Sequence, residues 1–352
     1  MKSSRRQIWY NLLRMKPRIL LVDNLMIRRY GNLRMGPGRK LNCGAVRNGW
    51  RICEFSDRDM ARLLAPLGIR PLGGRIANRK LLLTAKNFQP NVMLLGHCDY
   101  ITNATLHAIR DVCPGIKIAH FNVDPLWQAE TRAQMDERMD SCDALFATTA
   151  GDVLKNWVNG RNVVAYMPNP SDPSMENEDN GAKTSFERDL FFAGNPREGD
   201  PRWELLDRLM PKLAGVDAAI YRGGLWGAAY EKVLATTKMS LNLNRREGDK
   251  WYSSDRIAHL MGYGILTFQS SKNQMQDFFS PSETVFFDDA DDLAESILRH
   301  QSDDDARARI ASAGRARYHA LFNGARVLRY MVETLLGESH SEPYEWVKEV
   351  YR

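Results

Sequence analysis

The chain has 352 residues, 43% of them hydrophobic, and a formal net charge of +6. This length suits two globular domains, and the composition excludes a disordered chain. No apolar stretch is long enough to span a membrane, and the start of the chain lacks a signal-peptide pattern. The five cysteines form no C-x-x-C pair, which argues against a zinc site. We therefore expect a cytoplasmic protein with reduced thiols.

The leading segment is strongly basic. Residues 1–40 hold eleven basic residues and one acidic residue, a net charge of +10. Residues 5–16 interleave Ile8, Trp9 and Leu12 with arginine and lysine, which is typical of a helix at a membrane interface. The charge favours an anionic partner such as the inner face of a membrane. A helix packed on the domain, or a solvated arm, would show the same pattern. No nucleic-acid recognition motif accompanies the charge, so nucleic acid is not an expected partner.

The first half of the chain alternates short apolar runs with helical patterns. Strands are expected at 18–23, 50–55, 91–96, 117–121, 143–148 and 162–166, and helices at 57–67 and 103–112. This alternation predicts a doubly wound parallel sheet, whose ligands bind at the carboxyl ends of the strands. His97, His120 and Asp124 stand at or just beyond such strand ends.

The second half repeats the alternation after a change of composition. Residues 168–184 are rich in Pro, Asn, Asp and Glu and read as an interdomain linker. Strands are expected at 190–195, 217–221, 239–244 and 265–268, helices at 203–213, 228–236, 291–300, 304–316 and 318–336. These patterns predict a second Rossmann-like domain.

Residues 253–268 carry the most informative pattern. Ser253 or Ser254 can cap a helix, Arg256 adds a fixed charge in its first turn, and Gly262 and Gly264 end it before an apolar strand. A helix N-terminus with an arginine can hold phosphate, although an ordinary capped helix with a surface arginine would look the same.

This stretch resembles the nucleotide-sugar-binding helix of GT-B glycosyltransferases, in the C-terminal domain called glycosyl transferases group 1, of the CgeB-like (spore maturation protein-like) kind. In that family an arginine opens the helix, as Arg256 does here, and a ribose-binding Glu follows where this chain has His259. The resemblance continues through residues 274–297. It implies the GT-B fold, two Rossmann-like α/β domains facing a central cleft: 1–170 on the acceptor side, 185–340 on the donor side, and a crossover helix at 341–352.

The strand ends and the resemblance together supply the candidate site. Arginine matches phosphate in a bidentate manner, and glycine lets the backbone approach it. The candidates for binding the nucleotide sugar are Gly194, Asn195, Arg197, Arg222, Gly223, Ser254, Arg256 and His259. A general base is needed if the transfer inverts the sugar's configuration. The candidates for catalysis are Asp124, whose Asp-Pro pair resembles that of CgeB-like proteins, His97 and His120.

The predicted function is transfer of a sugar from a nucleotide-sugar donor to a glycan, a lipid-linked saccharide or a protein. The resemblance carries this prediction. We expect a metal-independent reaction without a cofactor. If His259 replaces the family's Glu, a neutral imidazole would offer the ribose one acceptor. The alternative is a non-catalytic nucleotide-sugar-binding or regulatory module of the same fold.

Overall fold

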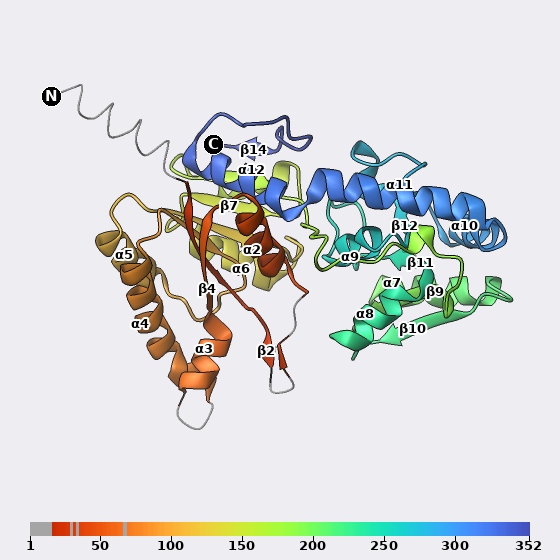
Figure 1. Ribbon diagram of the computed structural model, residues 1–352, viewed down its shortest axis with the longest axis horizontal. Helices are drawn as coiled ribbons and strands as arrows, with labels where there is room; N and C mark the ends of the chain where they lie inside the picture. The colour runs from red at the N-terminus through yellow and green to blue at the C-terminus, as the bar shows by residue number, and fades with distance from the viewer. Residues whose placement is uncertain (1–15, 29–30, 33–34, 66–68) are drawn as a thin grey trace.

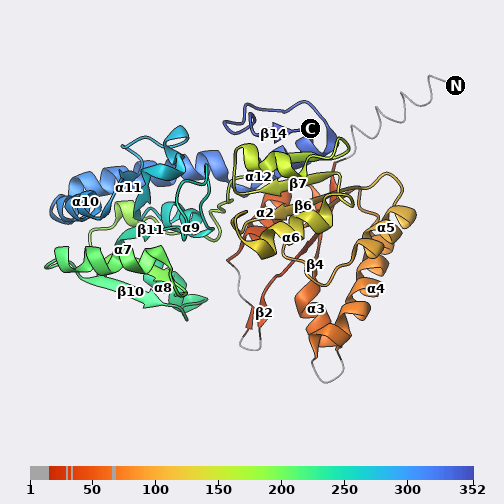
Figure 2. The same cartoon turned by 180° about the vertical axis from the view of Figure 1, so that it is seen from behind.

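The computed structural model describes residues 16–352 apart from residues 29–30, 33–34 and 66–68. It consists of two α/β domains set side by side (Figure 1, Figure 2). Most of the predicted leading helix, residues 5–15, lies outside the described residues, so that prediction stays untested. No helix within the described residues is both long and apolar enough to cross a bilayer.

The first domain is built on a seven-stranded sheet. Its order is β14 (Val350–Tyr351), β8 (Val163–Tyr166), β7 (Ala144–Ala147), β6 (Lys117–Asn122), β5 (Val92–Leu95), β1 (Arg18–Asp23) and β4 (Arg51–Ser56). All pairs are parallel except β14 with β8. The central strands are buried apolar runs, as expected for a sheet covered on both faces. The strand order reverses between β1 and β5, so a crevice is expected at their carboxyl ends.

Helices cover this sheet and one hairpin extends from it (Figure 1). The helices are α2 (Pro37–Arg47), α3 (Asp57–Leu64), α4 (Arg70–Phe88), α5 (Asn103–Val112), α6 (Ala129–Arg138) and the 3-10 helix η2 (Asp152–Trp157). The hairpin joins β2 (Ile27–Arg28) to β3 (Gly31–Asn32). It follows β1 directly and leads into α2, so it lies beside the carboxyl end of the first strand.

The second domain is built on a five-stranded parallel sheet, which has one strand, β13, more than the four expected from the sequence. Its order is β10 (Ala218–Arg222), β9 (Arg188–Gly194), β11 (Thr237–Asn242), β12 (Leu266–Ser270) and β13 (Val285–Phe287). Its helices are α7 (Pro201–Leu209), α8 (Ala228–Ala235), α9 (Arg256–Gly262), α10 (Ala290–Ser302) and α11 (Asp304–Phe322). Short 3-10 helices occupy Asn180–Ala182, Met210–Lys212, Ser271–Asn273 and Met275–Asp277. The order reverses between β9 and β11, so this sheet also has a crevice at its carboxyl edge.

The C-terminal segment corrects two predictions. Helix α12 (Gly324–Leu336) packs on α2 of the first domain, where Gly44 and Gly324 bring the two backbones together, so the predicted boundary at 340 lies too late. Residues 341–352 do not form the predicted crossover helix. They run irregularly and then add β14 to the first sheet, because burial of Tyr344 and Trp346 among aromatic side chains fixes another path.

Candidate functional site

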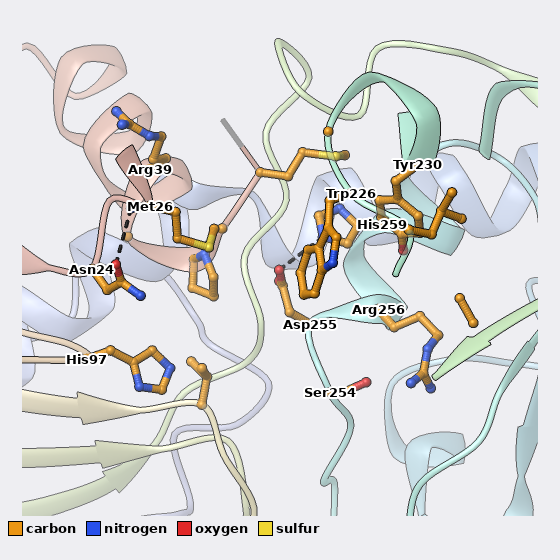
Figure 3. Close-up of a pocket in the computed structure, with 18 of the residues that line it drawn as sticks. Asn24, Met26, Arg39, His97, Trp226, Tyr230, Ser254, Asp255, Arg256 and His259 are labelled. Atoms are coloured by element: carbon orange, nitrogen blue, oxygen red, sulfur yellow. Dashed lines mark hydrogen bonds and ion pairs between the residues drawn. The ribbon is translucent and has the colours of Figure 1, made fainter. Parts of the chain in front are cut away.

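A cleft of about 560 Å³ opens between the carboxyl edges of the two sheets. The first domain contributes the loops after β1, β5 and β6 and the start of α2. The second contributes the loops after β9 and β10 and the segment that leads into α9 (Figure 3). Both crevices expected from the strand order therefore meet in one site.

Eight of the predicted site residues line this cleft and three do not. Those that line it are Gly194, Asn195, Gly223, Ser254, Arg256 and His259 from the second domain and His97 and Asp124 from the first. Arg197 is exposed outside it. Arg222 stacks its guanidinium on Trp203, 4.4 Å from the ring centroid, and also lies outside the cleft lining. The expectation that three arginines at strand ends converge therefore fails for these two.

His120 is also absent from the cleft lining. It is buried in β6, and its Nδ1 lies 3.0 Å from the Leu95 carbonyl oxygen. Burial, together with the nearby charge of Arg138, lowers the pKa of His120 to about 3. The side chain is a neutral core group, which corrects its prediction as a catalytic base.

Arg256 supplies a half-buried positive charge to the second-domain wall. Its Nη1 donates to the Leu243 carbonyl at 2.8 Å, and its guanidinium lies 5.1 Å from the Phe192 ring centroid. Burial lowers the pKa of Arg256 to about 10, a value at which the guanidinium is still charged at neutral pH. A half-buried cation held by one carbonyl and a ring face suits an anionic ligand.

Two further arginines, Arg202 and Arg245, strengthen this charge. Both donate through Nη2 to the Asn195 carbonyl, at 3.1 and 3.4 Å. Among the described residues, Asp200 is the one carboxylate paired with them, 2.6 Å from Arg202 and 3.5 Å from Arg245. The group formed by these two arginines, Asp200 and Arg256 thus keeps a surplus of positive charge. The two arginines fix the loop that carries Asn195 beside Gly223, which adopts φ 84°, a conformation that favours glycine.

Helix α9 begins differently from its prediction. Asp255 occupies its N-cap position without a side-chain cap, and the helix spans seven residues. Ser253 instead pairs with Asn242, whose Nδ2 donates to Ser253 Oγ at 3.0 Å. Among the described residues the buried Ser254 hydroxyl has no hydrogen-bond partner. Buried polar groups are seldom left unpaired, so Ser254 is available to a ligand in the cleft.

His259 belongs to a buried cluster of four ionisable side chains. Lys40 Nζ lies 2.9 Å from Glu176 Oε1 and 3.1 Å from Asp255 Oδ1. His259 reaches the same carboxylates, Nδ1 to Glu176 at 2.8 Å and Nε2 to Asp255 at 3.1 Å. Burial and the Lys40 charge lower the pKa of His259, but the two carboxylates outweigh them and the net shift is upward. Two carboxylates, one at each ring nitrogen, favour an imidazolium that donates from both, in place of the expected neutral imidazole.

The first-domain wall carries titratable groups that water can reach. His97 Nε2 lies 3.9 Å from Asp124 Oδ2, and these side chains are 28% and 53% exposed. Asp23 anchors this wall from below, since its Oδ1 accepts from the His97 and Asn24 amides, each at 2.8 Å. A Cβ atom at Gly38 would overlap the Asp23 carboxylate, so α2 starts directly against it. Burial raises the pKa of Asp23.

Sequence reasoning missed Lys40, Glu176, Asp255 and Trp226. The ionic cluster joins segments far apart in the chain, and no local pattern pairs them. Trp226 is 56% exposed and lines the cleft from the glycine-rich loop after β10 (Figure 3). A large aromatic residue between Gly224 and Gly227 was the available signal.

Comparison with known proteins agrees with this architecture. Residues 183–333 match the family described as "Glycosyl transferase-like". A search of curated proteins found no match. Among solved structures, apo OtsA superposes with a TM-score of 0.57 at 11% identity, covering 90% of this chain and 99% of its own. Sucrose-phosphate synthase from Thermosynechococcus elongatus gives 0.55 at 12%, covering 91% and 98%. HepE from Anabaena, in complex with UDP and glucose, gives 0.55 at 12%, covering 91% and 100%.

These similarities define the fold. The chain has the GT-B fold of two Rossmann-like domains around a cleft. The family match covers the second domain, which holds Arg256, Ser254 and the loops of Gly194 and Gly223.

Proposed function

We propose that the protein is a glycosyltransferase that takes its sugar from a nucleotide-sugar donor. The observation that carries the proposal is the wall of the cleft formed by the family-matched domain, where the half-buried Arg256 and the Ser254 hydroxyl, which has no partner among the described residues, adjoin glycine loops. A nucleoside diphosphate needs this combination of fixed positive charge and close backbone approach. The related fold of HepE, solved with UDP and glucose, supports the same ligand class.

The two walls of the cleft suggest two roles, binding of the departing phosphate and activation of the acceptor. The acceptor hydroxyl attacks the anomeric carbon, the bond from that carbon to the diphosphate breaks, and the diphosphate leaves with the electron pair. Arg256, backed by the charge of Arg202 and Arg245, stabilises the departing phosphate. Asp124 takes the acceptor proton in an inverting transfer, with His97 beside it. A retaining transfer relies more on stabilisation of the departing phosphate by positive groups. The residues of this cleft are compatible with an inverting or a retaining transfer.

The finer assignments are also proposals. The acceptor is a glycan, a lipid-linked saccharide or a protein, in a pathway of polysaccharide biosynthesis. The chain is of the CgeB-like kind, transfers a hexosyl or related group without a metal, and works in the cytoplasm. Its basic leading segment would hold it at the inner face of an anionic membrane.

One experiment separates this proposal from the alternative of a non-catalytic binding module. Calorimetry with a panel of nucleotides and nucleotide sugars identifies the ligand, and release of nucleoside diphosphate is then followed with candidate acceptors. Acceptor-dependent release by the wild-type chain, lost in Asp124→Asn, is the expected result. Tight binding with no release from any acceptor would favour the binding module. Absence of nucleotide binding would contradict both.

A further inference from the structure

We propose that the outer face of α4, in the first domain, is a docking surface for an anionic lipid bilayer. Of the ten large hydrophobic side chains that the described residues expose, five fall within residues 63–83. Three lie on α4 itself: Leu72, Ile76 and Leu83 are 56%, 37% and 44% exposed. Single exposed hydrophobics are ordinary, but a concentration of this kind marks an interaction site.

The three side chains form one stripe, and cations surround it. Spacings of four and seven residues place Leu72, Ile76 and Leu83 on one helix face. The opposite face, with Gly73, Ala77 and Leu81, is buried against the domain. The lipid-docking stripe comprises these exposed residues together with the exposed cations between them: Leu72, Arg75, Ile76, Arg79, Lys80, Leu83 and Lys86.

The charge of this stripe is not neutralised by the protein. Residues Arg70–Phe88 contain five basic residues and no acidic one. Within the described chain, no ion pair joins Arg75, Arg79, Lys80 or Lys86 to a carboxylate. The nearby acidic residues of α3, Asp57 and Asp59, are buried. The helix also stands at the outer edge of the molecule, away from the second domain (Figure 1, Figure 2).

These features select a membrane surface over other occupants. A helix of 19 residues, about 28 Å long, can lie in the headgroup plane with leucine and isoleucine inserted and basic residues at the phosphates. A second copy of the chain would bring two such cationic faces together. Nucleic acid would match the charge but not the three aliphatic side chains. None of its residues lines the nucleotide cleft.

Sedimentation of the full chain with vesicles tests this assignment. The wild-type chain should bind vesicles of phosphatidylglycerol and phosphatidylcholine at low salt, and bind phosphatidylcholine alone much less. The variant Arg75→Gln/Arg79→Gln/Lys80→Gln should bind at least about tenfold more weakly, because each removed cation lowers the attraction. The variant Leu72→Ser/Ile76→Ser/Leu83→Ser should also weaken binding, and what remains should be more sensitive to salt. Leu298→Ser/Arg309→Gln, exposed on α10 and α11 of the second domain, is the matched control.

The outcomes separate cleanly. Wild-type affinity in both α4 variants, or no binding of the wild-type chain to anionic vesicles, would overturn the proposal. So would a dimer, or binding to DNA alone, that disappears in the same variants. Melting curves exclude unfolding as the cause. Calorimetry with nucleotide should give the same affinity in every α4 variant, so a failure of the proposed glycosyl transfer leaves the vesicle result readable.

Discussion

The two walls of the cleft differ in how their charges are held. On the second-domain wall, Arg256 is half-buried and, like Arg202 and Arg245, is fixed to a backbone carbonyl. On the first-domain wall, Asp124 is half exposed, and its separation of 3.9 Å from His97 is too long for a hydrogen bond. A fixed, desolvated charge stabilises a ligand without rearranging, whereas an accessible carboxylate can exchange a proton. The contrast suggests that one wall binds and the other reacts.

Removing the accessible carboxylate should produce the largest change. Asp124→Asn removes the proposed base but keeps the shape, so kcat should fall about 10²- to 10⁴-fold. Nucleotide affinity, measured by calorimetry, should stay unchanged because Asp124 lies on the opposite wall. His97→Gln should have a smaller effect. Equal kcat in Asp124→Asn and the wild-type chain would remove Asp124 from the mechanism.

The ionic cluster of Lys40, Glu176, Asp255 and His259, which joins the two walls, should be the site most sensitive to substitution for stability. Lys40→Met leaves Glu176 and Asp255 without their shared buried cation, and such a loss costs about 3–5 kcal/mol of unfolding free energy. Lys272→Met is the matched control, since its ion pair with Glu247 is exposed and contributes at most about 1 kcal/mol. Denaturant titration measures the loss of unfolding free energy in each variant. Similar losses would show that the buried cluster contributes no more to stability than the exposed ion pair.

On the binding wall, Arg256→Ala should weaken nucleotide binding by about 1.5–3 kcal/mol, the usual contribution of a charged hydrogen bond. Arg222→Ala is its counterpart at another strand end, stacked on Trp203 outside the cleft lining. Its affinity should match that of the wild-type chain. Calorimetry that showed the reverse order would restore the sequence-based role of Arg222 and reject that of Arg256.

How much of this site the sequence could predict depends on how far apart in the chain the contacting residues lie. Alternating apolar runs predicted both sheets, and strand ends predicted Gly194, Asn195 and Asp124 at the cleft, because topology places carboxyl ends at one edge. Strand ends do not say which way a side chain turns, so Arg222 and His120 were misplaced. The cluster around His259 depends on partners 83 and 215 residues apart in the chain, beyond the reach of any local pattern.

This cluster should make stability fall as pH rises. The folded-state pKa of His259 lies above the ordinary 6.5, so its contribution is complete below pH 6.5 and is lost as pH rises through the folded value. The pKa values of Glu176 and Asp255 are lowered, so their contribution is lost only on strong acidification. Lys40 and Tyr230 are the other titratable groups that face His259.

The change of unfolding free energy above pH 6.5 should approach about 1.4 kcal/mol per pH unit at most. His259→Gln should flatten the profile between pH 6.5 and 9, as measured by denaturant titration. A wild-type profile that rises over this range would contradict the imidazolium assignment.

The smallest expected effect compares two adjacent serines at the entrance to α9. Ser254→Ala should weaken nucleotide binding by about 0.5–1.5 kcal/mol, the net contribution of one hydrogen bond, because its hydroxyl has no partner in the described chain. Ser253→Ala removes a hydroxyl that already pairs with Asn242, so it should lower the melting temperature and leave nucleotide affinity unchanged. Both variants remove a serine hydroxyl, and the two positions are adjacent. A general disturbance of the segment should therefore affect both variants equally. If Ser253→Ala weakened binding as much as Ser254→Ala did, the segment would act through its shape, and the free hydroxyl would have no part in holding the ligand.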